Sequence, residues 1–199
     1  MSTWIFKKLG LNNMNIDDIL VNIPDKFQHK TTTSHKFKRE LFEFFNKEEF
    51  KNKTCLEIGS NVGYTTRVLS YLFKEVVGFN LENVELAEKF NSDRSNVKFY
   101  AQDVYNTKLP IDYGDVFLID AEHTYDAVIN DTIRSLSFKS NDKKYFIYDD
   151  YGAFPEIKNA ITDLINYNKI KVIKYIGHPP NSVFTRQLFD YEGLICIES

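Results

Sequence analysis

Residues 54–66 decide the fold, and they read Thr-Cys-Leu-Glu-Ile-Gly-Ser-Asn-Val-Gly-Tyr-Thr-Thr. The first five residues are mostly apolar or β-branched, which is typical of a buried parallel strand. Gly59 and Gly63 follow, and glycine lets the backbone turn tightly and lie close to a ligand. Glu57 would then lie at the carboxyl end of the strand, where open α/β sheets bind ligands. We interpret the stretch as a strand-to-helix turn that holds a nucleoside cofactor.

The glycine spacing argues against two common nucleotide sites. A phosphate-binding P-loop ends in Gly-Lys-Ser/Thr, whereas this chain has Gly63-Tyr64-Thr65. A dinucleotide fingerprint needs three glycines in the order GxGxxG, and that spacing is absent. The pattern therefore favours a ligand with little phosphate charge. A glycine turn that only packs a helix on a strand is the alternative.

The composition is that of one globular domain. The chain has 199 residues, of which 43% are hydrophobic and 27% charged, and its net charge is -3. This charge disfavours a nucleic-acid partner or an anionic membrane surface. No apolar run approaches the roughly 20 residues that span a bilayer, and no signal peptide is evident, so we expect a cytoplasmic protein. Cys55 and Cys196 lack metal-ligand spacing and are expected to be buried core residues.

Apolar strands alternate with helical patterns from about residue 37 onward, which predicts βαβ units on a doubly wound α/β sheet. The expected strands are residues 54–58, 75–79, 97–102, 115–120, 144–148, 171–176 and 194–197, and the expected helices are residues 37–50, 64–73, 83–91, 125–138 and 154–168. Residues 1–36 lack the apolar pattern of a second core. We interpret them as a short N-terminal helical arm or lid, with a disordered tail as the alternative.

Acidic residues recur where the predicted strands end, namely Glu57, Asp103, Asp120, Asp149 and Asp150. The carboxyl ends of parallel strands share one cleft. Carboxylates gathered there repel one another unless a cation or hydrogen-bond donors compensate, so the pattern favours a positively charged ligand or a metal. All-oxygen ligation suits Mg²⁺, Mn²⁺ or Ca²⁺. As an alternative, the acidic pair after the fifth strand caps the following turn and helix.

His123 follows Asp120 by three residues in the loop that leaves the fourth strand. It could be a zinc ligand, a core histidine or a general base. An unperturbed pKa of about 6.5 suits proton removal near neutrality, which favours the general base.

These residues resemble the class I S-adenosylmethionine-dependent methyltransferases over about residues 37–197. Residues 56–63 are similar to the first motif of that family, in which the glycine turn contacts the methionine part of the cofactor. The resemblance assigns cofactor contacts to Glu57, Gly59, Ser60, Asn61 and Gly63, with Asn61 in place of the usual middle glycine.

Residues 76–80 are similar to the second motif, whose last residue is normally an acid that binds both ribose hydroxyls. Here that residue is Asn80. The ribose contact is therefore assigned to Asn80 or to Glu82 two positions later. Asp103 resembles the acid that accepts a hydrogen bond from the adenine amino group.

Residues 119–125 and 148–151 are similar to motifs of the metal-dependent small-molecule O-methyltransferases related to the macrocin and mycinamicin enzymes. This resemblance implies a Rossmann-like sheet with an antiparallel last strand over residues 37–199. It also implies that Asp120, Asp149 and Asp150 bind Mg²⁺ and that His123 is the base. The expected reaction is O-methylation of a sugar or other diol, in a possible homodimer. A methyltransferase-like domain that binds the cofactor or a partner without catalysis and a nicotinamide-dependent oxidoreductase are the competing hypotheses.

Overall fold

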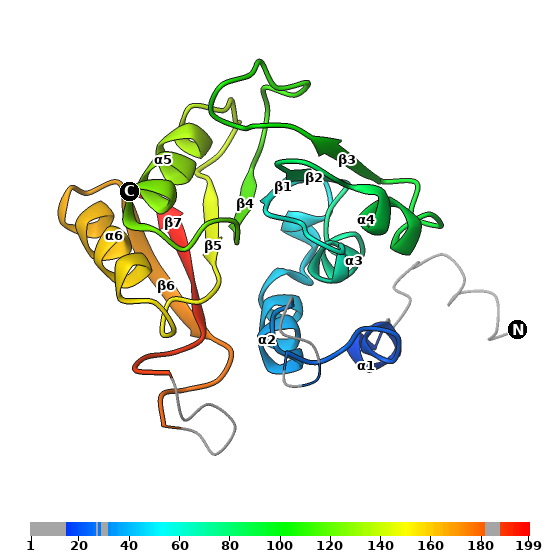
Figure 1. The fold of residues 1–199 in the computed structure, drawn as a ribbon, viewed down its shortest axis with the longest axis horizontal. Helices are drawn as coiled ribbons and strands as arrows, with labels where there is room; N and C mark the ends of the chain where they lie inside the picture. Colours follow the sequence, from blue (N-terminus) through cyan, green and yellow to red (C-terminus); the bar gives the residue numbers. More distant parts are fainter. Residues whose placement is uncertain (1–14, 27, 29–31, 182–187) are drawn as a thin grey trace, which may run out of the picture.

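A seven-stranded sheet with helices on both faces forms the body of the molecule (Figure 1). The computed structural model describes residues 15–26, 28, 32–181 and 188–199. The strand order is β3-β2-β1-β4-β5-β7-β6. The strands are β1 Thr54–Ile58, β2 Glu75–Asn80, β3 Val97–Ala101, β4 Val116–Ile119, β5 Tyr145–Tyr148, β6 Ile170–Ile176 and β7 Gly193–Glu198. β1 to β5 pair in parallel, whereas β7 is antiparallel to both β5 and β6. The predicted doubly wound sheet with an antiparallel last strand is confirmed.

The strand order reverses at β1, which pairs with β2 on one side and with β4 on the other. Ile58 at the end of β1 is in register with both Phe79 and Ile119. The loops that leave β1 and β4 therefore diverge at the carboxyl edge of the sheet. Such a reversal opens the crevice in which α/β sheets bind their ligands.

The helices predicted over residues 37–50 and 64–73 end early, at residues 45 and 69. Six α-helices are present in the described residues. They are α1 Ile16–Leu20, α2 His35–Phe45, α3 Tyr64–Leu69, α4 Glu85–Phe90, α5 Tyr125–Leu136 and α6 Pro155–Asn166. The single helix expected over residues 37–50 is wrong, because Asn46 leaves the helical region with φ -77° and ψ 62° and ends α2. A 3-10 turn, Glu48–Phe50, follows and lets the ring of Phe50 pack edge-on against Phe45 at 4.8 Å between centroids.

Side chains that alternate along the strands build two cores, one on each face of the sheet. The first core lies under α5 and α6 and includes Leu56 and Cys196. The second lies under α1, α2 and α3 and includes Cys55. Both cysteines are fully buried and free, as expected from their spacing.

The described part of the N-terminal arm packs on this second core. Ile19, Leu20 and Ile23 are buried against residues of α2 and α3, and Figure 1 shows α1 beside these helices. Residues 1–14, 27 and 29–31 of the predicted arm lie outside the described residues. Among the described helices, none combines the length and the apolar character that crossing a bilayer requires.

Candidate functional site

The turn after β1 depends on backbone conformations that favour glycine. Gly59, Asn61 and Gly63 all have positive φ, at 95°, 45° and 81°. A Cβ atom on Gly59 would lie 2.1 Å from the carbonyl oxygen of Asp120, so a side chain here would collide with the end of β4. The amides of Gly59 and Ser60 both donate to the carbonyl of Phe79 on β2. The turn thus joins the ends of three adjacent strands.

Asn80 holds this turn from the end of β2. Its Oδ1 accepts from the backbone amide of Asn61 at 2.8 Å and from the hydroxyl of Ser60 at 3.3 Å. Its Nδ2 donates to the carbonyls of Asn61 and Asn83, at 3.1 and 2.8 Å. An aspartate could not make these two donations, because a carboxylate carries no N–H. Asparagine at this position therefore has a structural explanation within the chain itself.

A cavity of about 490 Å³ lies beside this turn, against the ends of β2 and β3 and the loop after β4. Asp103 lines it and accepts hydrogen bonds from the amide of Tyr105 and the side chain of Asn106, which lower the pKa of Asp103. Asn80 and Leu81 also border the cavity. Glu82 is exposed and lines neither this cavity nor the smaller one described next.

A second cavity, of about 140 Å³, lies on the other side of the turn. Its walls include Glu57, Ser60 and the acids that follow β4 and β5. The two cavities share Gly59, Asn61, Asp120 and Ala121. The predicted cleft is thus divided in two, with Asp120 at the junction and Asp103 apart from the other acids.

Glu57 at the end of β1 is buried and accepts a hydrogen bond from the hydroxyl of Thr66 on α3. Burial raises the pKa of Glu57 to about 8, against the effect of this hydrogen bond. At neutral pH the carboxyl is therefore mostly protonated. A cationic ligand in the smaller cavity would favour the ionised form.

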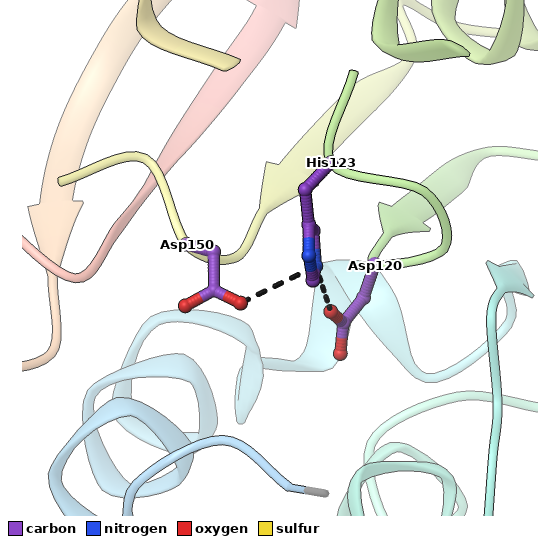
Figure 2. A group of neighbouring side chains, drawn as sticks. All are labelled: Asp120, His123 and Asp150. Atoms are coloured by element: carbon purple, nitrogen blue, oxygen red, sulfur yellow. Dashed lines mark ion pairs between the residues drawn. The ribbon is translucent and has the colours of Figure 1, made fainter. Parts of the chain in front are cut away.

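His123 lies between two carboxylates that come from different strands, as Figure 2 shows. Its Nε2 is 3.3 Å from Oδ2 of Asp150 and 4.0 Å from Oδ1 of Asp120, and neither contact has hydrogen-bond geometry. The carboxylates of Asp120 and Asp150 raise the pKa of His123 above its ordinary 6.5, although burial opposes them. Phe154 stacks on the imidazole at 4.4 Å between ring centroids and fixes its plane.

The acidic pair after β5 does not cap the following helix with its side chains. The N-cap of α6 is Phe154, without a side-chain cap, and only the backbone carbonyl of Asp150 accepts from the next turn. Asp149 is buried, and its Oδ1 has no hydrogen-bond partner. Ligand atoms of Asp120, His123 and Asp150 lie within 4.8 Å of one another. This donor set is one that could hold a divalent cation.

Lys26 already brings one positive charge to these acids. Its Nζ donates to Oδ1 of Asp150 at 2.7 Å and lies 3.6 Å from Oδ2 of Asp149 and 3.8 Å from Oε1 of Glu192. Burial alone would lower the pKa of Lys26, but the three carboxylates raise it above its ordinary range. The site therefore contains a cation of the chain itself.

Comparison with solved structures identifies the fold, whereas sequence comparison gives no family. No family model matches the chain, and no curated protein sequence matches it. Many solved methyltransferase structures do match. The *Burkholderia thailandensis* 1,6-didemethyltoxoflavin-N1-methyltransferase, with bound 1,6-didemethyltoxoflavin and S-adenosylhomocysteine, superposes with a TM-score of 0.62 at 11% identity, over 81% of this chain and 78% of that one.

Two further structures have the same architecture. A *Haemonchus contortus* phosphoethanolamine N-methyltransferase, in complex with phosphoethanolamine and S-adenosylhomocysteine, gives a TM-score of 0.61 at 11% identity, over 94% of this chain and 50% of that chain. The *Aquifex aeolicus* tRNA (m1A58) methyltransferase gives 0.60 at 16% identity, over 93% and 75%. The chain has the S-adenosylmethionine-dependent methyltransferase fold.

Sequence reasoning missed three residues of this methyltransferase-fold site: Lys26, Lys38 and Glu192. Lys38 on α2 is fully buried, and burial lowers the pKa of its amine to about 8 against the pull of nearby carboxylates. Its Nζ donates to the hydroxyl of Thr32 and the carbonyl of Thr33. Glu192 accepts hydrogen bonds from the amide and the hydroxyl of Ser34, which also caps α2. No local motif marks Lys26 or Glu192, because their partners Asp150 and Ser34 lie 124 and 158 positions away in the sequence.

Proposed function

We propose that the protein is an S-adenosylmethionine-dependent methyltransferase that methylates a hydroxyl group of a small molecule such as a sugar or another diol. The observation that carries this proposal is the meeting of the two cavities at Asp120. One cavity has the size and partly apolar lining that suit a nucleoside. The other gathers three aspartates and a histidine. A methyl donor held across the junction would present its reactive group to the acidic cavity.

The larger cavity would hold the adenosine part of the cofactor. Asp103 can accept a hydrogen bond from the adenine amino group, and the apolar ends of β1 and β2 can contact the ring. Asn61 and Asn80 line the same cavity and would lie beside the ribose. We infer that Asn80 acts mainly by shaping the turn, since its amide is fully used there.

The smaller cavity would hold the methionine end and the substrate. The cofactor's ammonium and sulfonium are positive. Asp120, and Glu57 once the bound cation favours its ionised form, would supply negative charge beside them. Loss of the methyl group removes the sulfonium charge. The acidic walls therefore favour the cofactor over its neutral thioether product.

The residues present fit a divalent metal ion. Asp120 and Asp150 would hold it, since their ligand atoms and one of His123 lie within 4.8 Å of one another. Asp149, the third predicted ligand, lies outside that group, but its buried Oδ1 has no hydrogen-bond partner among the described residues. When bound, a cation such as Mg²⁺ supplies Lewis-acid chemistry that lowers the pKa of a substrate hydroxyl and orients it. A vicinal diol is the substrate class that would chelate such an ion.

His123 is the candidate general base. Its Nε2 faces the acidic cavity and makes no hydrogen bond in the described structure. Stacking on Phe154 keeps the ring in place, so Nε2 can take the proton from a hydroxyl as the methyl group is transferred. Asp120 and Asp150 would stabilise the imidazolium that forms.

The net charge of the chain, rather than the comparison with solved structures, favours a small-molecule substrate. The net charge of -3 disfavours a polyanionic substrate. The structural neighbours include proteins named for small-molecule N-methylation and for tRNA methylation.

Calorimetry with S-adenosylhomocysteine, followed by methyl-transfer assays on a panel of diols with and without EDTA, tests the proposal. We expect binding of the cofactor product and metal-dependent O-methylation. Binding without any transfer would favour the non-catalytic domain, and saturable binding of NAD in place of S-adenosylhomocysteine would favour the oxidoreductase. Full activity in EDTA would overturn the metal assignment alone.

A further inference from the structure

Lys26 reaches the acidic cavity from a segment outside the sheet and its crossover helices. It lies between α1 and α2, and 124 positions separate it from Asp150 in the sequence. Its side chain keeps 26% of its surface exposed, so it lies at the mouth of the cavity rather than within the core. The ammonium is thus brought to the cavity by a segment that belongs to neither the sheet nor its crossover helices.

The ammonium occupies the oxygens that a metal would need. The two carboxylate oxygens of Asp150 contact different residues: Oδ1 is 2.7 Å from Nζ of Lys26, and Oδ2 is 3.3 Å from Nε2 of His123. The same ammonium lies 3.6 Å from the second metal candidate, Asp149. Mg²⁺ binds carboxylate oxygens at about 2.1 Å, so an ion ligated by both aspartates would lie within a few ångströms of Nζ. Two cations so close in a partly buried site repel strongly.

The described residues just before Lys26 make polar contacts with His35 at the start of α2. Asp25 accepts from the amide of His35, and Nε2 of His35 contacts the carbonyl of Ile23 at 2.7 Å. Ile23 is the buried anchor on the preceding side. Rotation of the Lys26 side chain would break its ion pair with Asp150 without moving the backbone, because each ion pair of Lys26 is made through Nζ.

We propose that Lys26 and a divalent metal ion occupy the acidic site alternately, so that the lysine closes the metal-free site and metal binding displaces it. The inference rests on the metal assignment of the proposed function. It adds that the chain supplies its own competitor for the metal. It also explains why the acidic cavity is small, since Lys26 is one of its walls.

Calorimetric titration of Mn²⁺ into the wild type, Lys26→Met and Lys98→Met tests the competition. Methionine keeps the length of the side chain without its charge. Lys98 is a matched control because it pairs with Glu75 at the surface. Glu75 begins β2, whereas the cavities lie where that strand ends. We expect Lys26→Met to bind Mn²⁺ about tenfold more tightly than the wild type. Lys98→Met should bind like the wild type. Equal affinities in all three proteins, or no Mn²⁺ binding in any, would overturn the proposal.

Chemical acetylation of the wild-type protein, measured separately for each lysine, gives a second measurement that does not depend on a variant. Mass spectrometry would follow the acetylation rates of Lys26 and Lys98 with and without Mn²⁺. We expect Mn²⁺ to speed the labelling of Lys26 and to leave Lys98 unchanged, whereas an unchanged rate at Lys26 contradicts displacement. Binding of S-adenosylhomocysteine to the same samples separates the two proposals. Normal binding with no effect at Lys26 refutes the competition, and absent binding refutes the methyltransferase assignment.

Discussion

The two cavities that meet at Asp120 are stabilised in different ways. Around the larger one, polar side chains are satisfied by neighbours in the same turn, as Asn80 is by Asn61 and Asn83, and Asp103 by Asn106. Around the smaller one, Asp149 Oδ1 and His123 Nε2 have no hydrogen-bond partner among the described residues. The negative charges of the smaller cavity are balanced instead by Lys26, which is distant from them in the sequence.

This difference separates recognition from chemistry. A preformed and locally satisfied wall binds a constant ligand without rearranging. Unpaired or charge-paired groups are the ones that can change partners during a reaction. We therefore expect substitutions near the larger cavity to change cofactor affinity and substitutions near the smaller one to change the rate.

Gly59→Val should have the largest effect, because it affects both cavities. The new Cβ would lie 2.1 Å from the carbonyl oxygen of Asp120, and valine strongly disfavours the φ of 95°. We expect S-adenosylhomocysteine binding to weaken by about 100-fold or more in calorimetry. Asn61→Gly is the control, since glycine tolerates the positive φ there. Equal binding by Gly59→Val and the wild type would show that the turn lies outside the cofactor site.

His123→Gln should show most clearly that one cavity serves the reaction and the other serves cofactor binding. We expect the methyl-transfer rate to fall by between about 100-fold and 10,000-fold, the range for loss of a general base, with cofactor binding unchanged. In the wild type, the base acts only when neutral. Because its pKa is raised, the rate should rise with pH through a value above 6.5. A variant with the full wild-type rate would exclude His123 as the base.

Asp150→Asn should also spare the cofactor while slowing the reaction. It removes the charge that contacts both Lys26 and His123, and we expect the rate to fall by about 100-fold. Asp142→Asn, at an exposed ion pair with Lys53, is the charge-matched control. A comparable loss of cofactor affinity in Asp150→Asn would contradict the division between the cavities.

Glu57→Gln should change how cofactor binding depends on pH. Because the pKa of Glu57 is about 8, a cationic ligand must displace its proton below that pH. Calorimetry of S-adenosylmethionine should show affinity that rises toward pH 8, by at most about tenfold per pH unit. The dependence should flatten in Glu57→Gln. The folded state holds this proton more tightly than the unfolded state, so the free energy of unfolding without ligand should fall as pH rises from 4.5 to 8.

Glu82→Gln should have the smallest effect. Glu82 is exposed and lines neither cavity, so we expect cofactor affinity to stay within about twofold of the wild type. Asn80→Ala, which removes four hydrogen bonds of the turn, should weaken binding more. The reverse order would assign the ribose contact to Glu82.

The strands could be predicted from the sequence because each lies between clear turn signals. β1, Thr54–Ile58, has the predicted bounds, and the other strands differ by at most one residue at either end. The prediction extends α2 to residue 50, although Phe50 follows Phe45 by five residues and so falls outside the helical spacing of the preceding apolar residues. There, aromatic packing rather than periodicity decides the backbone.

The strand-end rule explains why part of the site could be predicted. It gathers Glu57, Asp120, Asp149 and Asp150 around one cavity, since consecutive strand ends meet at one edge of the sheet. It says nothing about segments that reach this edge from elsewhere. Lys26 belongs to that class, because only tertiary packing brings it to Asp150.

The contacts of Glu192 have a consequence for the order of folding. Glu192 directly precedes β7, and 158 positions separate it from Ser34. It accepts a hydrogen bond from the hydroxyl of Ser34, the residue that caps α2. Contacts between such distant residues form slowly, because a long loop must close first. The hydrogen bonds that join Gly59, Ser60 and Asn61 to the end of β2 span 20 positions or fewer, so the glycine turn can form while much of the chain is still unfolded. We therefore expect a refolding protein to acquire the cofactor wall before the acidic cavity, and to pass through a stage that can bind but cannot react.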